Sequence, residues 1–235
     1  FFRLGNTYVD QSYYINNVEI LLMEWIDMKN TDQQKLGKGL GEMHIESNQF
    51  NPKTLVKATK FFEAHEPIIE ELIFAIKNEP SLVLNRPEKP TKNGFQTHEI
   101  LASNDSKIKK LIGDDLLKIC QNYFLNLNQN DLQLRNYNFS LSGWGVILLN
   151  EGKQERHIHP ESLVSGVLYL KVPKVVADSS NDMGNLFFPA NNSLSIVPKK
   201  GEIILFPSYL PHETKRFSSD EERICISFNL TGREK

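Results

Sequence analysis

The hydrophobic pattern changes along the chain from a helical period to a strand period, and this change constrains the fold most. From Asn138 onward, apolar, β-branched and aromatic residues form short runs separated by glycine, proline and asparagine. The runs are 138–149, 163–172, 185–188, 194–197, 202–206 and 223–229. Many short strands that follow a helix predict an antiparallel sandwich or jelly roll.

The part of the chain before these strands has the helical period. A strong amphipathic helix is predicted at 107–124, and another is predicted after Pro67, which suits the first turn of a helix because its missing N–H costs nothing there. Residues 78–97 are rich in proline, asparagine and lysine and are predicted to be a linker. We therefore expect an α+β chain with a helical segment at 1–80 and a β domain at 91–235.

The helical segment contains a faint internal repeat. Leu4-Gly5-Asn6-Thr7-Tyr8 and Leu40-Gly41-Glu42-Met43-His44 share the pattern L-G-x-x-Y/H. Their spacing resembles that of tetratricopeptide repeats, whose period is about 34 residues. The resemblance implies an arm of helical hairpins that binds a protein partner or a peptide. The alternative is ordinary helical packing in front of the β domain.

Composition excludes several classes of function. The net charge of −2 and the pI near 6.4 give no basic face for nucleic acid, and no apolar run has the roughly 18–20 residues that cross a bilayer. Cys120 and Cys225 lie in apolar patterns and are expected to be buried free thiols, which suits the reducing cytoplasm. The chain begins with Phe1 rather than methionine, so we expect it to be part of a longer protein.

Three of the six histidines lie in the β half and form a candidate metal site. His157 and His159 are two residues apart, so on an extended strand their side chains point to the same face. His212 follows a later apolar run and can supply the third ligand of the same metal site. Glu161 shares the face of His157 and His159, so a shifted set in which His159 and Glu161 form an H-x-E pair stays open.

The order of these motifs resembles the Fe(II)/2-oxoglutarate-dependent oxygenases, in particular a branch with H-x-H-P and F-P-S-x-L-x-H motifs. The resemblance covers about residues 91–235 and implies a double-stranded β-helix, or jelly roll, with a supporting helix. The matching pieces are Trp144, Ile147-Leu148-Leu149-Asn150, His157, His159-Pro160, Ser165-Gly166-Val167, Tyr169, Phe206-Pro207-Ser208, His212 and the run from Arg223 to Asn229.

The resemblance implies that Fe(II) is the metal and that His157, His159 and His212 are its catalytic ligands. Such enzymes usually hold iron with two histidines and one carboxylate. This chain departs from that pattern, because His159 stands where an aspartate is expected. An all-histidine set leaves one more positive charge on the site, which favours a dianionic cosubstrate, and it also suits Zn²⁺.

The cosubstrate 2-oxoglutarate needs a fixed cation for its distal carboxylate. The resemblance assigns this role to Arg223, because a guanidinium binds a carboxylate through two parallel hydrogen bonds. Arg216 is a rival for this role. Tyr169 is expected to donate its hydroxyl to the same carboxylate, and Asn150, or alternatively Asn229, is expected to orient the metal-chelating carboxylate or a metal-bound water.

The implied activity is hydroxylation of an unactivated C–H bond with O2 and 2-oxoglutarate, releasing succinate and CO2. Similarity in layout to prolyl hydroxylases favours a peptide or protein substrate, although a small molecule stays open. Two alternatives remain. One is a cupin-type three-histidine metalloenzyme that does not use 2-oxoglutarate, and the other is a non-catalytic partner-binding module.

Overall fold

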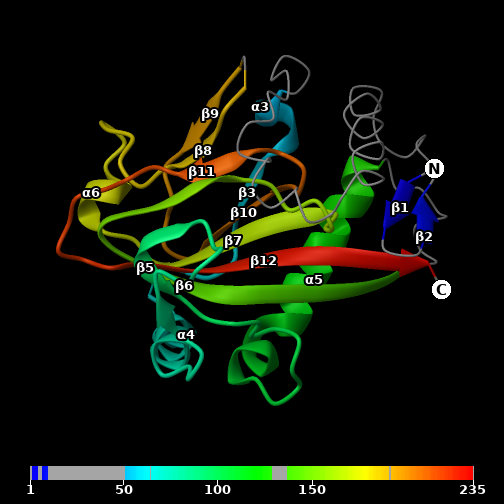
Figure 1. Cartoon of the computed structure of the whole chain (residues 1–235), viewed down its shortest axis with the longest axis horizontal. Helices are drawn as coiled ribbons and strands as arrows, with labels where there is room; N and C mark the ends of the chain where they lie inside the picture. The colour runs from blue at the N-terminus through cyan, green and yellow to red at the C-terminus, as the bar shows by residue number, and fades with distance from the viewer. Residues whose placement is uncertain are drawn as a thin grey trace.

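A curled antiparallel β-sheet forms the body of the protein, with the helices α4 and α5 on one side of it (Figure 1). The computed structural model describes residues 2–4, 7–9, 51–63, 65–128, 137–190 and 192–234. The sheet has ten strands, of which eight follow the order β3-β10-β7-β12-β6-β11-β8-β9, while β5 pairs with β6 and β4 with β5. This arrangement confirms the expected jelly-roll class of fold.

Six of the ten strands of the sheet correspond to the six runs expected from the sequence, and the other four, β3, β4, β5 and β11, lie outside those runs. The ten strands are β3 (Lys57–Lys60), β4 (Val83–Leu84), β5 (Thr91–Gln96), β6 (Tyr137–His157), β7 (Val164–Lys171), β8 (Leu186–Phe188), β9 (Leu194–Ile196), β10 (Glu202–Pro207), β11 (His212–Thr214) and β12 (Arg223–Glu234). A separate hairpin joins β1 (Phe2–Leu4) and β2 (Thr7–Val9).

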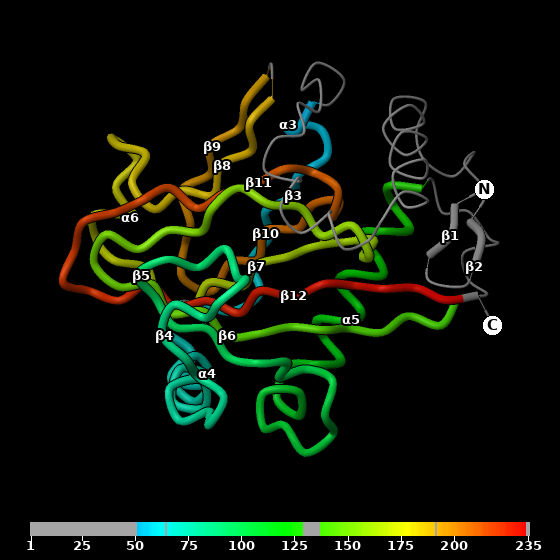
Figure 2. The backbone as a smooth tube through the Cα atoms, viewed as in Figure 1, coloured from blue at the N-terminus to red at the C-terminus, as the bar shows by residue number. Residues whose placement is uncertain are grey.

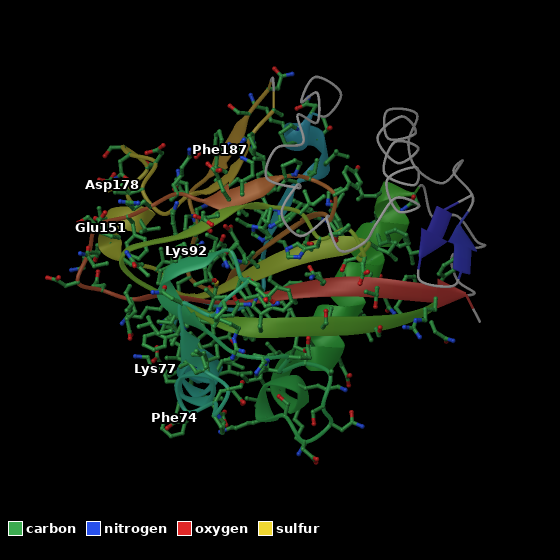
Figure 3. The ribbon with its side chains drawn as sticks, viewed as in Figure 1. Phe74, Lys77, Lys92, Glu151, Asp178 and Phe187 are labelled. Carbon is green, nitrogen blue, oxygen red and sulfur yellow. The ribbon has the colours of Figure 1, made fainter. Side chains whose placement is uncertain are left out.

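The long strand β6 bends the sheet on itself. Its first part pairs with β12, and its last part pairs with the short strand β11. The bend falls at Glu151, which has a positive φ of 60°, and at Gly152, where a Cβ atom would lie 2.6 Å from the carbonyl oxygen of Leu149. Glu151 is labelled at the left of the view in Figure 3. The bend lets one strand contribute to both sides of the curled sheet.

Two apolar cores lie on opposite faces of the sheet. Every residue of β7 from Val164 to Leu170 is buried, and successive side chains alternate between the two cores. Leu168 and Leu170 face the core shared with the helices, whereas Val167 and Tyr169 face the interior of the curled sheet. Each fully buried aliphatic side chain contributes about 1.5–3 kcal/mol, so this strand is a main source of stability.

The helices α4 (Pro67–Lys77) and α5 (Lys107–Leu127) confirm the two helices expected from the sequence. Pro67 occupies the first turn of α4 as expected, and the hydroxyl of Ser106 caps α5 by accepting a hydrogen bond from the backbone N–H of Lys109. Phe74 lies on the outward side of α4 (Figure 3) and is 65% exposed. The short helices are α3 (Pro52–Leu55) and α6 (Lys174–Ala177), and none of the described helices is long and apolar enough to span a membrane.

The described part of the segment before residue 91 is only partly helical. Residues 57–60 form strand β3, which pairs with β10 (Figure 2). The expected linker contains β4 and β5, and α4 contributes to the same core as α5. The apolar core between the helices and the sheet therefore contains residues from both sides of the boundary that we expected between the helical segment and the β domain.

The repeat-like pattern is not supported where the structure describes it. In its first copy, the described residues Leu4, Thr7 and Tyr8 lie in the paired strands β1 and β2 instead of a helix. Its second copy, from Leu40 to His44, lies outside the described residues. The partner-binding arm expected on this repeat therefore stays a prediction.

Candidate active site

The pairing of two strands brings the histidines together. His157 is the last residue of β6, and His212 is the first residue of β11, directly opposite His157 in the antiparallel register. His159 follows two residues later, and its backbone N–H donates to the carbonyl oxygen of Ser208 over 2.9 Å. That bond ties the chain after β6 to the turn between β10 and β11, which places the third imidazole beside the other two.

The three histidines have the spacing of a metal site. One ring nitrogen of each lies within 4.8 Å of those of the other two. The ring centroids of His157 and His212 are 4.3 Å apart, and that of His159 lies 4.9 Å from His157 and 5.3 Å from His212. Glu161 is not part of this cluster, so the geometry favours the all-histidine set over the H-x-E pair.

Hydrogen bonds at Nδ1 orient two of the rings. Nδ1 of His157 lies 2.7 Å from the carbonyl oxygen of Glu155, and Nδ1 of His212 lies 2.9 Å from that of Leu210. A carbonyl can only accept, so each Nδ1 carries the proton and each Nε2 keeps a lone pair. These two histidines are therefore prepared to bind a metal through Nε2.

The surroundings keep all three imidazoles neutral. Burial lowers the pKa of His157, although its bond to Glu155 opposes the shift. Burial, together with the charges of His157 and Lys89, lowers the pKa of His159 to about 3. The pKa of His212 is held well below its usual range by burial and by the other two histidines. Neutral imidazole is the form that binds metals, so the cluster stays competent at neutral and mildly acidic pH.

A cavity of about 260 Å³ lies beside the histidines. Its apolar wall includes Val167 and Phe206, and the indole ring of Trp144 lies 5.9 Å from the ring of His159. Polar side chains of the wall come from several strands and from the connection between β4 and β5; they include Glu88, Lys89, Gln96, Gln154, Ser227 and Asn229. The cluster is therefore accessible to a small molecule or to part of a larger substrate.

Arg223 and Tyr169 lie on the same inner face of the sheet as this cavity. Alternate residues of β12 face inward, and this face carries Arg223 together with the cavity-lining Ser227 and Asn229. Tyr169 lies on the neighbouring strand β7, opposite Cys225, and is fully buried. The guanidinium carbon of Arg223 lies 4.9 Å from the centre of the Tyr169 ring.

Both side chains lack the partners that buried polar groups normally have. Nε of Arg223 and the hydroxyl of Tyr169 have no hydrogen-bond partner of good geometry among the described residues. The nearby guanidinium only opposes the rise that burial causes in the pKa of Tyr169, and Nη1 of Arg223 makes a weak contact of 3.9 Å with the sulfur of Cys225. No described carboxylate forms an ion pair with this arginine. A buried cation beside an unsatisfied phenol fits a carboxylate ligand, which would satisfy both.

Two residues considered from the sequence lie elsewhere. Asn150 is exposed, and its side-chain oxygen accepts hydrogen bonds from the backbone N–H of Ser219 and the hydroxyl of Ser218. It orders that loop and does not line the cavity. Arg216 is also exposed and pairs with Glu151. The alternative amide, Asn229, is the one that lies against His159.

Sequence reasoning missed the two glutamines of the cavity wall. Gln96 lies on β5, inside the expected linker, and Gln154 lies on β6 near its bend. Both are buried. Their positions depend on the pairing of β5 with β6, and no local pattern in the sequence reveals that pairing.

Comparison with known families agrees with this site. Residues 142–229 match the family described as "Putative 2OG-Fe(II) oxygenase", and the matched segment contains all three histidines and Arg223. No curated protein matches the chain.

Solved structures share the fold over most of the chain. A prolyl-4-hydroxylase from Pseudomonas putida has 18% identity and a TM-score of 0.54, with 77% of this chain and 95% of that chain covered. A 2OG-Fe(II) oxygenase family oxidoreductase from Burkholderia pseudomallei has 12% identity, a TM-score of 0.55 and coverage of 83% and 87%. A Trichoplax adhaerens prolyl hydroxylase in complex with a hypoxia-inducible-factor peptide has 14% identity, a TM-score of 0.55 and coverage of 88% and 92%.

The family match rests on the strands that carry the histidines and Arg223, and the fold of the rest agrees with it. The matched segment resembles the core of a 2OG-Fe(II) oxygenase and carries the histidine cluster, and the protein is an iron- and 2-oxoglutarate-dependent dioxygenase.

Proposed function

We propose that the protein hydroxylates a C–H bond of a peptide or protein, with Fe(II) held by His157, His159 and His212. The observation that carries this proposal is the convergence of three neutral imidazoles beside a cavity. Bound Fe(II), with dioxygen and 2-oxoglutarate, supplies the oxidising power for C–H hydroxylation and releases succinate and CO2. The protein holds these groups and the substrate in the relative positions that the reaction needs and excludes competing reactions.

Arg223 and Tyr169 are proposed to bind the distal carboxylate of 2-oxoglutarate. Their unsatisfied, fully buried Nε and hydroxyl groups support this role. An unpaired buried cation is costly, and a carboxylate ligand offsets that cost. Because the three histidines carry no negative charge, the metal centre also attracts the dianionic cosubstrate.

A chain of hydrogen bonds in the cavity wall supports an amide-containing substrate. The hydroxyl of Thr214 donates to Oε1 of Gln154 over 3.5 Å, and Nε2 of Gln154 donates to the hydroxyl of Thr91 over 3.4 Å. Thr91 in turn donates to Oε1 of Gln96 over 2.9 Å. The chain fixes the amide of Gln96 and leaves its Nε2 without an acceptor among the described residues.

Gln96 lines the cavity although only 2% of its surface is exposed. Nε2 of Gln96 is not among the fully buried atoms that lack a partner, so it is reachable from the cavity and can donate to an acceptor that a substrate brings. The carbonyl oxygen of a peptide bond is such an acceptor. Trp144, beside His159, adds an apolar surface against which a flat or cyclic side chain can pack. The prolyl hydroxylases among the structural neighbours support the same substrate class.

The test is turnover with purified protein, Fe(II), 2-oxoglutarate and ascorbate, against a pool of proline-containing and other peptides. We expect succinate formation that increases with peptide, and peptide products heavier by one oxygen atom in mass spectra. A variant with His212→Ala serves as the inactive control. Metal binding without any succinate, with or without peptide, would contradict the proposal and favour the cupin-type alternative.

A further inference from the structure

His159 differs from the other two histidines in the group that meets its Nδ1. Backbone carbonyl oxygens contact Nδ1 of His157 and of His212. Nδ1 of His159 instead lies 3.4 Å from the side-chain nitrogen of Asn229. An amide can present either a donor or an acceptor to a ring nitrogen, whereas a carbonyl can only accept. Which nitrogen of the His159 ring carries the proton therefore depends on which atom of the Asn229 amide faces it.

Asn229 belongs to a buried polar cluster with Ser165 and Ser208. Only 6% of Asn229, 2% of Ser165 and none of Ser208 is exposed. The hydroxyl of Ser165 lies 2.8 Å from Oδ1 of Asn229 and 2.9 Å from the hydroxyl of Ser208. Asn229 and Ser165 are direct partners in the pairing of β12 with β7. The cluster therefore holds the amide firmly beside His159.

The two orientations of this amide have opposite consequences. A metal bound through Nε2 of His159 requires the proton on Nδ1, and an NH2 group facing Nδ1 selects the other tautomer. A half-turn of the amide exchanges Oδ1 and Nδ2 without changing its shape. His159 Nδ1–H then donates to Oδ1, Nδ2–H donates to Ser165, and Ser165 donates to Ser208. Each of these contacts then joins one donor to one acceptor, and all three histidines share one tautomer.

We propose that Asn229 is a positioning residue for His159 and that, in the metal-bound protein, its carbonyl oxygen faces Nδ1. In this orientation it selects the Nδ1–H tautomer, fixes the ring plane and directs Nε2 to the metal. The inference rests on the proposed function in one respect, because it takes His159 as a ligand. Partners of this kind typically change metal affinity by about 10–100-fold when they are removed.

The experiment measures Co(II) affinity and the visible Co(II) spectrum of the whole chain, without 2-oxoglutarate or substrate. Asn229→Leu keeps the size and removes the acceptor, and we expect about 10–100-fold weaker binding and shifted bands. Asn229→Asp restores an acceptor and should bind within a few-fold of the unaltered protein, with its spectrum. Asn185→Leu is the matched control, because Asn185 is a buried amide that does not line the cavity, and we expect no change.

Other results overturn the inference. Unchanged affinity and spectrum in Asn229→Leu would show that His159 needs no such partner, and equal losses in Asn229→Leu and Asn229→Asp would show that only the shape of the amide matters. If Asn229→Leu does not fold, Ser165→Ala replaces it; it should weaken Co(II) binding several-fold, and an unchanged affinity would refute the role. If the unaltered protein binds no Co(II), or if His212→Ala binds it equally well, the proposed metal site itself is wrong.

Discussion

His212 on β11 lies directly opposite His157 on β6, and their ring centroids are 4.3 Å apart. The candidate metal site is therefore a product of strand register, although the two residues are far apart in sequence. A slip of one residue in this pairing would turn one of the two side chains to the other face of the sheet. Paired strands therefore hold these two candidate ligands.

Metal binding should stabilise the fold. A ligand that binds only the native state adds about 2.7 kcal/mol when its concentration is one hundred times its Kd. We expect the Tm to rise on addition of Co(II) or Mn(II) to chelator-treated protein and to fall again with excess chelator. The shift should be lost in His212→Ala. A shift of the same size in that variant would place the stabilising metal elsewhere.

Removal of the Arg223 guanidinium should weaken the binding of 2-oxoglutarate more than it weakens metal binding. Loss of a charge-assisted contact in a closed pocket costs about 2–5 kcal/mol, so Arg223→Ala should raise the KM for 2-oxoglutarate by at least about 30-fold. Because the guanidinium has no described ion-pair partner, its removal should not destabilise the ligand-free protein through a broken salt bridge.

The exposed pair of Arg216 and Glu151 offers a matched control for this prediction. Arg216→Ala removes the same charge from the surface and should leave the KM for 2-oxoglutarate unchanged. Equal effects of Arg216→Ala and Arg223→Ala would assign the loss to general electrostatics and would remove the specific role of Arg223.

The strand part of the site could be predicted from the sequence because its signals are local. Alternation in β6, β7 and β12 fixes which residues face inward, and the H-x-H spacing places two ligands on one face. Alternation alone does not separate Asn229 from Asn150, because Asn150 is in phase with the inward-facing Val146 and Leu148 of β6. Asn229 is in phase with Arg223 on the inner face, whereas Asn150 immediately precedes the bend at Glu151. The choice between Asn150 and Asn229 could not be made from the sequence, because the bend, and the loop that the Asn150 side chain orders, are not visible in the pattern.

The remaining parts depend on contacts between distant segments. Residues 78–97 have the composition of a linker, yet Thr91 and Gln96 are buried because β5 pairs with β6. Strand β3 has no apolar alternation of its own and is defined by its pairing with β10. Such short edge segments take their conformation from the sheet they join, and tertiary contacts override their local preference.

The metal-free protein should lose stability as the pH falls below about 6.5. Burial lowers the pKa of His157, His159 and His212 in the folded state from a usual value of 6.5. In this range the unfolded chain binds protons that the folded chain does not, so stability is full above the unfolded pKa and decreases below it. Each such histidine contributes up to about 1.4 kcal/mol per pH unit. Chemical denaturation between pH 7.5 and pH 5 measures this, with His159→Gln expected to show a shallower slope.

Gln96 should affect substrate binding without affecting the reaction of 2-oxoglutarate alone. Gln96→Leu removes the free amide donor from the cavity wall and should raise the KM for a peptide substrate by about 10-fold, as expected for one lost hydrogen bond of about 1.4 kcal/mol. Succinate formation in the absence of peptide is the internal control and should be unchanged. A parallel loss of both activities would show that the substitution disturbs the metal site.

Truncation should distinguish the part of the N-terminal segment that the domain needs from the part that it does not. Ile69, Leu72 and Ile76 of α4 are fully buried in the core that α5 and the sheet share, and β3 completes the sheet beside β10. A chain that begins at residue 91 lacks α4 and β3, exposes that apolar core and should aggregate, because a large apolar patch is a liability in a soluble protein. A chain that begins at residue 51 keeps both elements and should remain monodisperse, with the Co(II) affinity of the unaltered protein. Size-exclusion chromatography and Co(II) titration of the two truncated chains test this. A monodisperse, metal-binding chain from residue 91 would show that the β domain folds without α4.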